Sequence, residues 1–345
     1  MKRSAFIALS LGLGIFIALL TWRGAGMIAQ TFAAAGWGIA VVALYHLLPL
    51  FLDAAAMHVL RDRLVSELSD RHLSFRRTLG ARWAGEAVNS LMPAGQMGGP
   101  VVMARMLSDA EGPVSSAGAL VAVSTTQQVL AQSLFALTGI ILLSLRTGSG
   151  KVVVPLIAGI AVFTFAGVML YRLQRRGLFA RLSALLSRTG IGRKHPGLMR
   201  GAAKLDHMID SLYGQAQAVR RCFALNLAGW FVGTGEVWLA LYFLGHPVDF
   251  ADALLLESLG QAVRGIAFAI PGALGVQEGG FLLLAPFVGL TPDTALALSL
   301  CKRARELLLG LPGLAYWHWA EHHRRSRDLR NLRGAPPHAP PVADH

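Results

Sequence analysis

Six long apolar stretches restrict what this chain can fold into. They cover residues 5–22, 34–60, 113–145, 152–171, 222–244 and 293–318. The hydrocarbon core of a bilayer is roughly 30 Å thick, and a helix of about 20 apolar residues crosses it. Because lipid offers no hydrogen-bond partners, a spanning segment must satisfy its own backbone groups, as a helix does. The pattern predicts an all-α polytopic membrane protein with about six transmembrane helices.

The composition also indicates a membrane protein. Only 15% of the residues are charged and 54% are hydrophobic, whereas a typical soluble domain has about 25% charged residues. The first apolar stretch follows Met1, Lys2 and Arg3 and could instead be a signal peptide. Its run from Ala5 to Leu20 is long for the apolar core of a signal peptide, and no clear small-residue cleavage site follows it. We therefore expect an uncleaved helix.

The distribution of basic residues predicts the orientation. Lys and Arg (32) outnumber Asp and Glu (19). They lie between apolar stretches, so we expect no nucleic-acid partner. Most of them fall next to the N-terminus or in 61–82, 172–221 and 324–333. Because cytoplasmic loops carry an excess of Lys and Arg, both termini are predicted to be cytoplasmic, in a multi-pass protein of the bacterial inner membrane.

Residues 1–333 are predicted to form a single integral membrane domain with one polar interruption. Residues 172–221 carry Leu178, Leu182, Leu185 and Leu186 at helical spacing among basic residues. This pattern predicts a cytoplasmic amphipathic connector whose basic face meets anionic lipid headgroups; a solvated connector is the alternative. The Pro-rich tail, 334–345, lacks apolar periodicity and is predicted to be disordered.

Two further apolar regions, 78–108 and 251–290, are broken at their centres by Gly and Pro. Irregular backbone at membrane depth is tolerated only where it is buried in protein or lines a wet cavity. We therefore interpret both regions as re-entrant helical hairpins. The predicted breaks are Pro93, Gly95, Gly98 and Gly99 in the first hairpin and Pro271, Gly272, Gly275 and Gly279 in the second.

The two hairpins also match in position. Glu86 and Arg264 each lie seven residues before the central proline, and another proline follows each hairpin and opens an apolar helix. With the predicted orientation, the two units enter the membrane from opposite sides. We predict an inverted-topology repeat, 34–145 and 222–318, with a transport site near its midplane. Chance similarity of two Gly- and Pro-rich stretches is the alternative.

Charged residues deep in the last apolar stretch indicate a functional site, because ionisable groups at the bilayer centre are costly. Lys302, Arg303, Arg305 and Glu306 lie about ten residues past Asp293, or roughly 15 Å along a helix. Arg303 and Glu306 can pair on one face. The remaining positive charge suits an anionic group, either the carboxylate of Glu278 or a lipid phosphate.

We predict a central polar cavity, whose lining we assign to Glu86, Asn89, Gln127, Gln128, Arg264, Glu278, Arg303 and Arg305. Glu278 or Glu86 could couple transport to a proton gradient. The alternative is a set of structural ion pairs that hold the hairpin tips together. Asp53 and Glu236 also interrupt apolar stretches, and we interpret them mainly as polar contacts between helices.

No pattern predicts an enzyme, a metal site or a cofactor site. Cys222 and Cys301 are far apart, and neither has a second ligand at metal-binding spacing. His318 and His322 have i,i+4 spacing but lie beside two Trp residues, as expected at a membrane interface. Ser, His and Asp occur without any nucleophile-elbow motif.

Several segments resemble a known family. They are IPGALGVQEGGFLLLAPFVGL (270–290), ALALSLCKRARELLLGLPG (295–313), HLLPLFLDAAAM (46–57) and NSLMPAGQMGG (89–99). The chain resembles the lysylphosphatidylglycerol synthase transmembrane, or flippase-like, family, and within it the HpnL branch associated with hopanoid biosynthesis. It departs from the family in the first hairpin, where Pro100 and Met103 replace a common acid and Arg.

The resemblance implies an inner-membrane protein that lacks the soluble aminoacyltransferase domain of true lysylphosphatidylglycerol synthases. It also implies translocation of a membrane lipid substrate, a hopanoid or another polar lipid. One alternative is a non-catalytic accessory protein or a membrane-embedded enzyme of hopanoid lipid biosynthesis. Another is a scaffold that binds hopanoid biosynthesis enzymes through residues 172–221.

Overall fold

The computed structural model describes 33, 35–68, 74–92, 98–111, 114–147, 150–187, 196–266, 273 and 275–334. All regular structure in these residues is helical, in agreement with the predicted all-α class. The predicted span 5–22 lies outside the described residues, as does 335–345 of the predicted tail.

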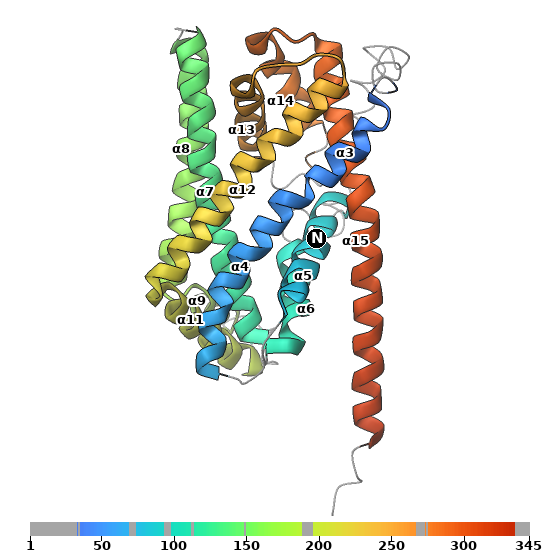
Figure 1. Ribbon diagram of the computed structural model, residues 1–345. Coiled ribbons are helices and arrows are strands. Elements are labelled where there is room, and N and C mark those ends of the chain that lie inside the picture. The colour runs from blue at the N-terminus through green and yellow to red at the C-terminus, as the bar shows by residue number, and fades with distance from the viewer. Residues whose placement is uncertain are drawn as a thin grey trace, which may run out of the picture.

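The helices follow the chain in the order shown in Figure 1. They are α3 (Gly38–Tyr45), α4 (Leu47–Leu68), α5 (Phe75–Leu91), α6 (Gly98–Glu111), α7 (Val114–Thr147), α8 (Gly150–Arg175), α9 (Leu178–Ser187), α11 (Pro196–Gly214), α12 (Ala216–Phe243), α13 (Phe250–Ile266), α14 (Val276–Leu284), the 3-10 helix η3 (Ala285–Val288) and α15 (Pro292–Gly334).

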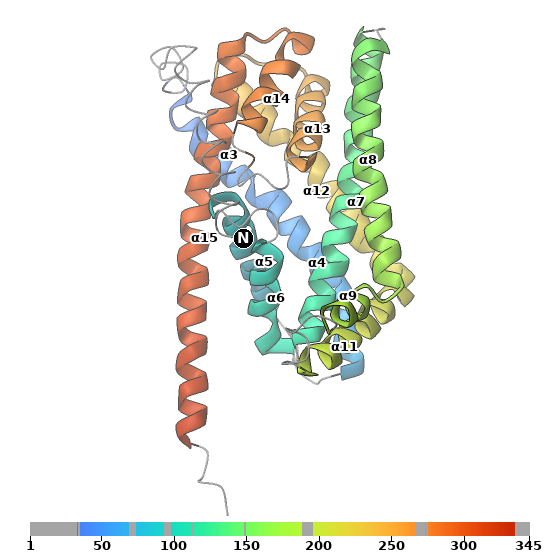
Figure 2. The ribbon, with the colours of Figure 1, turned by 180° about the vertical axis from the view of Figure 1, so that it is seen from behind.

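Helix α12 crosses the face of the bundle that is in front in Figure 1, beside α4, and packs against α4, α7 and α13. Helix α8 packs along α7, and α5 packs along α15. Figure 2 shows the same bundle from behind, with α15 continuing well past the other helices. With 43 residues, α15 is about 64 Å long at 1.5 Å per residue, roughly twice the thickness of a bilayer core.

The predicted stretch 34–60 forms two helices instead of one. Pro49 lies in the first turn of α4 and has no N–H to donate to the Tyr45 carbonyl, so the regular i to i−4 ladder is interrupted there. His46 occupies the junction between α3 and α4. The interruption places its imidazole at a bend in the chain and inside the bundle.

Two segments of the described chain are long and apolar enough to cross a membrane, Gly38–Leu60 and Ser115–Arg146. Helices α12 and α15 are also long, but polar residues interrupt them: Glu236 in α12 and Lys302 to Glu306 in α15. The count of six spans stays a prediction. The helices that are less apolar than expected are the ones that supply charged groups to the interior.

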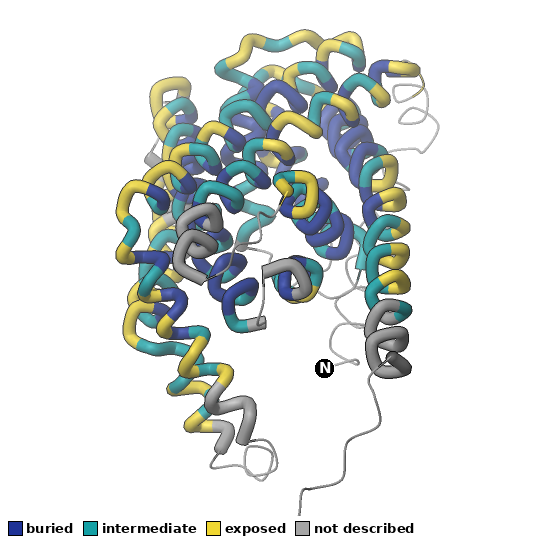
Figure 3. The backbone as a smooth tube through the Cα atoms, turned by 60° about the horizontal axis from the view of Figure 1, so that its bottom comes forward, coloured by how far each residue is buried: buried dark blue, intermediate teal, exposed yellow. Residues whose placement is uncertain are grey.

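The outer surface carries many large apolar side chains. On α7 and α8 these are Leu134, Leu137, Ile141, Leu145, Val154, Ile157, Val162, Phe165 and Met169. Figure 3 shows buried residues on the inward faces of the helices and exposed residues on the outward faces. Soluble monomers rarely expose contiguous apolar surface on this scale, so these faces are suited to contact with lipid.

Pairs of short helices lie where the sequence predicts hairpins. Helix α5 packs against α6, and α13 packs against α14. The two pairs lie toward opposite ends of the bundle. The connecting residues 93–97, 267–272 and 274 are outside the described part, including the predicted breaks Pro93, Gly95, Pro271 and Gly272. The relation between the pairs as an inverted repeat stays a prediction.

Three predicted break residues lie inside helices instead. Gly98 and Gly99 begin α6, and Gly279 lies in α14. Gly99 is needed for close packing, because a Cβ there would lie 2.5 Å from the Gly85 carbonyl oxygen and 2.6 Å from the Asn89 amide nitrogen. Gly275 does mark a break, since it precedes α14 with φ of 77°, a conformation that favours glycine.

The stretch between α8 and α12 folds onto the bundle. Helices α9 and α11 pack against each other, and α11 also packs against α7 and α8. The Asp206 carboxylate accepts hydrogen bonds from the backbone N–H groups of Phe179 (3.1 Å) and Ala180 (2.6 Å) at the start of α9. The Gln174 side-chain oxygen accepts from Thr126 and Tyr213. These bonds fix the connector to α7 and α8.

Two apolar cores occupy opposite ends of the bundle. One contains Val42 of α3 and Ile140 of α7 and extends through α12, α13 and α15. The other contains Met57 of α4 and Leu120 of α7 and extends to α5, α6 and α11. On α7, Gln127 and Gln128 fall between the two cores. A polar layer therefore crosses the middle of an otherwise apolar bundle.

Close packing of α7 on α13 predicts a strong effect of one methyl group. A Cβ on Gly139 would meet Ser258 Oγ and would lie 2.9 Å from Leu259 Cγ, whereas nothing lies within 4 Å of a Cβ on Gly233 in α12. We expect Gly139→Ala to lower the free energy of unfolding by about 1–3 kcal/mol because of overpacking. The control Gly233→Ala should be neutral or slightly stabilising. Thermal unfolding in detergent measures both, and equal midpoints would contradict this packing.

The connector predicts a dependence of stability on alkaline pH. Burial raises the pKa of Tyr213 to about 12, and its hydroxyl donates to Gln174 over 2.7 Å. The folded protein holds this proton at pH values where the unfolded chain, with an ordinary pKa of about 10, has lost it. Stability should therefore fall by about 2 kcal/mol as pH rises from about 10 to about 12. Tyr213→Phe should show a smaller fall in thermal unfolding over the same range.

Candidate functional site

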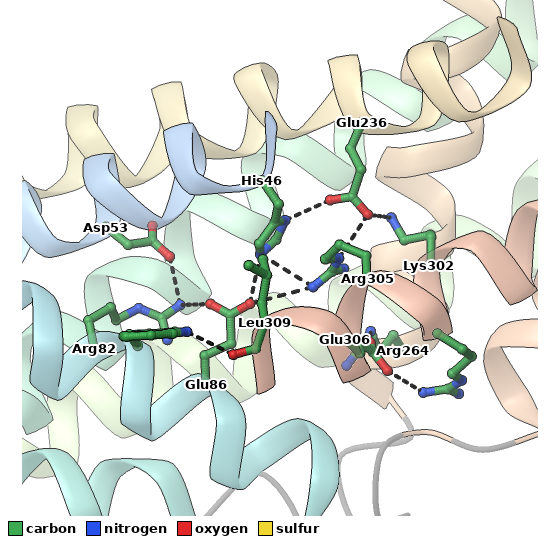
Figure 4. A network of polar contacts seen from close by, with 12 residues as sticks. His46, Asp53, Arg82, Glu86, Glu236, Arg264, Lys302, Arg305, Glu306 and Leu309 are labelled. Atoms are coloured by element: carbon green, nitrogen blue, oxygen red, sulfur yellow. Dashed lines mark hydrogen bonds and ion pairs between the residues drawn. The ribbon is translucent and has the colours of Figure 1, made fainter. Parts of the chain in front are cut away.

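The polar layer consists of ionisable side chains from six helices and the α3–α4 junction, drawn in part in Figure 4. Its acids are Asp53, Glu86, Glu236, Glu257, Glu278 and Glu306, and its bases are His46, Arg82, Arg264, Lys302, Arg303 and Arg305. We refer to these twelve residues as the central cluster. No side chain among them is more than 24% exposed.

His46 lies at the centre of the central cluster. Its Nδ1 atom is 2.6 Å from Glu236 Oε2 of α12, and its Nε2 atom is 2.7 Å from Glu86 Oε1 of α5. Arg305 approaches from α15 and donates to Glu236 Oε1 over 3.1 Å. One imidazole thus connects a helix of the first predicted unit to two helices of the second (Figure 4).

Helix α15 presents two cations on one face. Lys302 donates to Glu257 Oε2 of α13 over 2.7 Å, and its Nζ atom is 3.7 Å from Glu236 Oε1. Gln261 donates to the other Glu257 oxygen. Both Lys302 and Arg305 contact Glu236, as their i,i+3 spacing allows. The Lys302 side chain is 2% exposed, so its charge is compensated almost entirely by protein groups.

The other face of α15 holds a second set of ion pairs. Arg303 donates to Glu306 on the same helix over 2.8 Å and to Glu278 of α14 over 3.1 Å. Arg264 of α13 donates to Glu306 over 2.6 Å and to Gln277 over 2.9 Å. These bonds join α13 and α14 to α15.

A third set of contacts extends along α4. Arg82 of α5 donates to Asp53 Oδ2 over 2.6 Å and lies 3.8 Å from Glu86. Gln128 of α7 donates to the same Asp53 oxygen over 3.0 Å. Helix α5 is also tied to α15 by the Trp83 indole, which donates to the Leu309 carbonyl over 2.9 Å. These contacts extend the central cluster to α4, α5 and α7.

The structure brings most of the predicted site residues together. Glu86, Gln128, Arg264, Glu278, Arg303 and Arg305 all take part in contacts of the central cluster. Asn89 has a different role, since its side-chain oxygen accepts from the Gly99 backbone N–H over 2.7 Å and joins α5 to α6. Gln127 is buried on α7, and the hydrogen bonds described for the central cluster do not include it.

Sequence reasoning missed the most central residue and underrated three acids. His46 is one of two histidines in the apolar stretch 34–60, the other being His58, and a histidine in such a stretch is the only local signal of its role. Asp53 and Glu236 make the polar contacts between helices that the sequence predicts, but they also belong to the central cluster, which the sequence does not indicate. The sequence also does not assign Glu257 to the site. Each contacts a base contributed by another helix. The site predicted as positive from α15 alone is balanced by acids from α5, α12, α13 and α14.

A small pocket opens beside the central cluster. Its lining combines charged and apolar groups: His46, Leu50, Trp83, Glu86, Ala87, Ser90, Arg305, Glu306, Leu309 and Gly310. The free volume is about 10 Å³, which is close to the minimum for one water molecule. In this conformation the pocket admits water and excludes a lipid headgroup.

A larger groove lies beside α3 and α12, next to the start of α13. It has a volume of about 610 Å³ and is lined by Tyr45, Gly235, Trp238, Leu239, Val248, Asp249 and Phe250. Tyr45 and Gly235 directly precede His46 and Glu236 in the chain. The Tyr45 hydroxyl donates to the Val232 carbonyl over 3.0 Å. The wall between groove and central cluster is therefore the α3–α12 contact.

The described part of the chain contains no group of three or more His, Cys, Asp or Glu side chains arranged to hold a metal ion. Both cysteines are free and buried. The acids of the central cluster face arginines, lysine and His46, which leaves them paired with cations of the protein.

Ion pairing in the central cluster predicts strongly coupled substitutions. Lys302→Met leaves Glu257 buried without its cation, which should lower the free energy of unfolding by about 3–5 kcal/mol. Lys302→Met combined with Glu257→Gln removes both charges and should recover most of that loss. A double-mutant cycle from thermal unfolding in detergent measures the coupling.

The control for this cycle is an exposed pair. Arg175 and Asp210 lie 3.2 Å apart, with side chains 42% and 63% exposed. Arg175→Gln should change the free energy of unfolding by less than about 1 kcal/mol. Additive effects of Lys302→Met and Glu257→Gln would contradict the described contact.

Comparison with known proteins identifies the family. No curated protein and no solved structure matches the chain. The family described as "Lysylphosphatidylglycerol synthase TM region" matches residues 7–313, which include the whole central cluster. This match indicates a membrane protein with a lipid-related function. The chain therefore belongs to the lysylphosphatidylglycerol synthase transmembrane region family.

Proposed function

We propose that this protein translocates polar lipids across the bacterial inner membrane, with the headgroup passing through the central cluster. The observation that carries the proposal is a buried layer of twelve ionisable residues in the middle of an apolar bundle. Ionisable groups at such depth are costly and usually mark the path of a polar substrate. Membership of a membrane lipid-related family supports the same function.

The arrangement of the two short helix pairs supports an alternating-access mechanism. The pairs α5/α6 and α13/α14 lie toward opposite ends of the bundle, and residues from both contact α15. We propose that they are the re-entrant hairpins of an inverted repeat, the arrangement that many transporters use around a midplane site. Exchanging ion pairs between the hairpins and α15 would open the central cluster to one side at a time.

The conformation described is closed around the central cluster. Its pocket holds about one water molecule, so a headgroup can enter only after α5, α12 or α15 moves. The groove beside Tyr45 and Trp238, of about 610 Å³, is within the size range of small-molecule sites. We propose that the apolar part of the lipid lies in this groove while its headgroup crosses the α3–α12 contact.

The cargo we propose is a hopanoid-type lipid or another polar lipid. The segments around 46–57, 89–99 and 270–313, which resemble the HpnL branch, support a hopanoid. Arginines Arg303 and Arg305 favour a headgroup with anionic or hydroxyl groups. We propose cytoplasmic termini on the basis of the excess of basic residues in 61–82, 172–221 and 324–333.

The connector supports a second contact, with anionic headgroups of the surrounding membrane. Arg172, Arg176 and Arg181 are exposed, and so are Leu182 and Leu185. Basic residues beside exposed leucines are typical of a surface that lies at the membrane interface. We propose that this surface anchors the connector to the cytoplasmic leaflet.

Leaflet-resolved transport in proteoliposomes tests the proposed function. Labelled polar hopanoid and labelled phospholipid are compared for wild type, Glu278→Gln, Arg305→Gln and the control Arg175→Gln. We expect wild type and the control to accelerate movement of one lipid between leaflets. Each cluster variant should reduce the rate about 10- to 100-fold, because a charge-assisted hydrogen bond contributes about 1.5–3 kcal/mol.

No acceleration by folded wild type for any lipid would contradict translocation and favour an accessory or enzymatic role in hopanoid synthesis. Loss of product in cells carrying the cluster variants would then indicate an enzyme. Tolerance of those variants, with failure after neutralising Arg172, Arg176 and Arg181, would indicate a scaffold.

A further inference from the structure

The hydrogen-bond pattern around His46 specifies the protons that its ring must carry. Both ring nitrogens lie within 2.7 Å of carboxylate oxygens, Glu236 Oε2 at Nδ1 and Glu86 Oε1 at Nε2. An ionised carboxylate only accepts hydrogen bonds, and a neutral imidazole has one N–H. Two such contacts are satisfied together when the ring is the doubly protonated imidazolium.

The charge count of the central cluster leads to the same result independently. Its carboxylates number six, and its arginines and lysine number five. With His46 neutral, the described cluster carries one uncompensated negative charge in a low-dielectric interior, which is unfavourable. One proton on His46 makes the described cluster neutral.

The other groups around His46 are consistent with a positive ring. His46 contacts Glu86, Glu236 and Arg305. The other charged groups on the surrounding helices are Asp53 of α4, Arg82 of α5, and Lys302 and Glu306 of α15, while α7 contributes the uncharged Gln128. Arg305 Nη1 lies 3.3 Å from His46 Nε2. A protonated His46 and Arg305 can lie this close because both contact Glu236 and Glu86. Arg305 is 3.1 Å from Glu236 and 3.5 Å from Glu86.

Water can reach this proton without opening the path for a lipid. His46 and Glu86 both line the small pocket, which has space for about one water molecule. A proton can therefore leave His46 through the pocket while the α3–α12 contact stays closed. Loss of the proton removes a hydrogen bond to α5 or to α12 and leaves both carboxylates facing each other across a neutral ring.

We propose that His46 is the proton-binding site of this protein and that its protonation holds α5 to α12 in the closed conformation. Release of the proton frees α5 from α12 and opens the central cluster. This step rests on the proposed translocation, because it assigns the proton gradient as the energy source for moving the headgroup. The proton-binding site itself does not depend on which lipid is moved.

Nitrogen-15 NMR of histidine-labelled protein in nanodiscs tests the site directly. The chain has 11 histidines, and at about pH 7.5 an ordinary histidine is mostly neutral. We expect a doubly protonated imidazolium signal in wild type that is absent in His46→Gln. His58→Gln is the matched control, because His58 also lies in this segment and its Nδ1 atom is 3.5 Å from the Thr78 hydroxyl; it should keep the signal.

Glu86→Gln provides a second, independent variant that keeps the ring. It removes one negative charge, so a neutral His46 then balances the central cluster and the imidazolium signal should disappear. A wild-type spectrum without this signal, or a signal that survives in folded His46→Gln or Glu86→Gln, would overturn the proposal. If His46→Gln does not fold, Glu86→Gln decides the result.

Transport with and without an imposed pH gradient tests the coupling. The gradient should accelerate lipid movement by wild type and by His58→Gln, and His46→Gln should lose that response. A His46→Gln rate that still responds to the gradient as wild type does would overturn the coupling. If wild type moves no lipid, the proposed function fails, and the NMR result still decides whether His46 binds the proton.

Discussion

The need to compensate buried charge organises this structure. Removing an ionised side chain from water costs several kcal/mol, and a single partner rarely compensates that cost. Here carboxylates and cations alternate from Asp53 through Arg82, Glu86 and His46 to Glu236, and each charge has neighbours of opposite sign. Because the partners come from different helices, helix positions depend on these contacts as well as on apolar packing.

The location of the central cluster follows from the apolar cores on either side of it. The two cores lie on either side of the central cluster along α7 and α12, so most polar side chains between them are buried. Transport through such a layer requires the ion pairs to exchange partners without leaving any charge uncompensated. The shared acids make exchange possible, since Glu236 contacts His46, Arg305 and Lys302 at the same time.

The sequence predicted the helical class, the two interrupted regions, five residues of the central cluster and Gln128, which contacts it. Span length, Gly and Pro breakers and buried charges leave local signals. The i,i+3 spacing also predicted the ion pair of Arg303 with Glu306, which the structure contains. Ion pairs between different helices left no such signal. In the sequence, Glu236 is a single acid in an apolar helix, and its partners His46 and Arg305 lie on other elements. The partner of Lys302, Glu257, likewise lies on another helix, α13. The position of Gly99 inside α6 depends on close packing against Gly85 and Asn89, which composition does not encode.

Helix α15 connects the central cluster to a distant part of the molecule. It continues from Glu306 to Gly334 with Pro312 inside it, a length of about 42 Å at 1.5 Å per residue. Pro312 has no N–H to donate to the Leu308 carbonyl, so the helix has one missing backbone hydrogen bond just past the central cluster. Over about 42 Å, a tilt of about 5° at Glu306 displaces Gly334 by about 4 Å. A small movement at the ion pairs therefore becomes a larger one at the far end of α15.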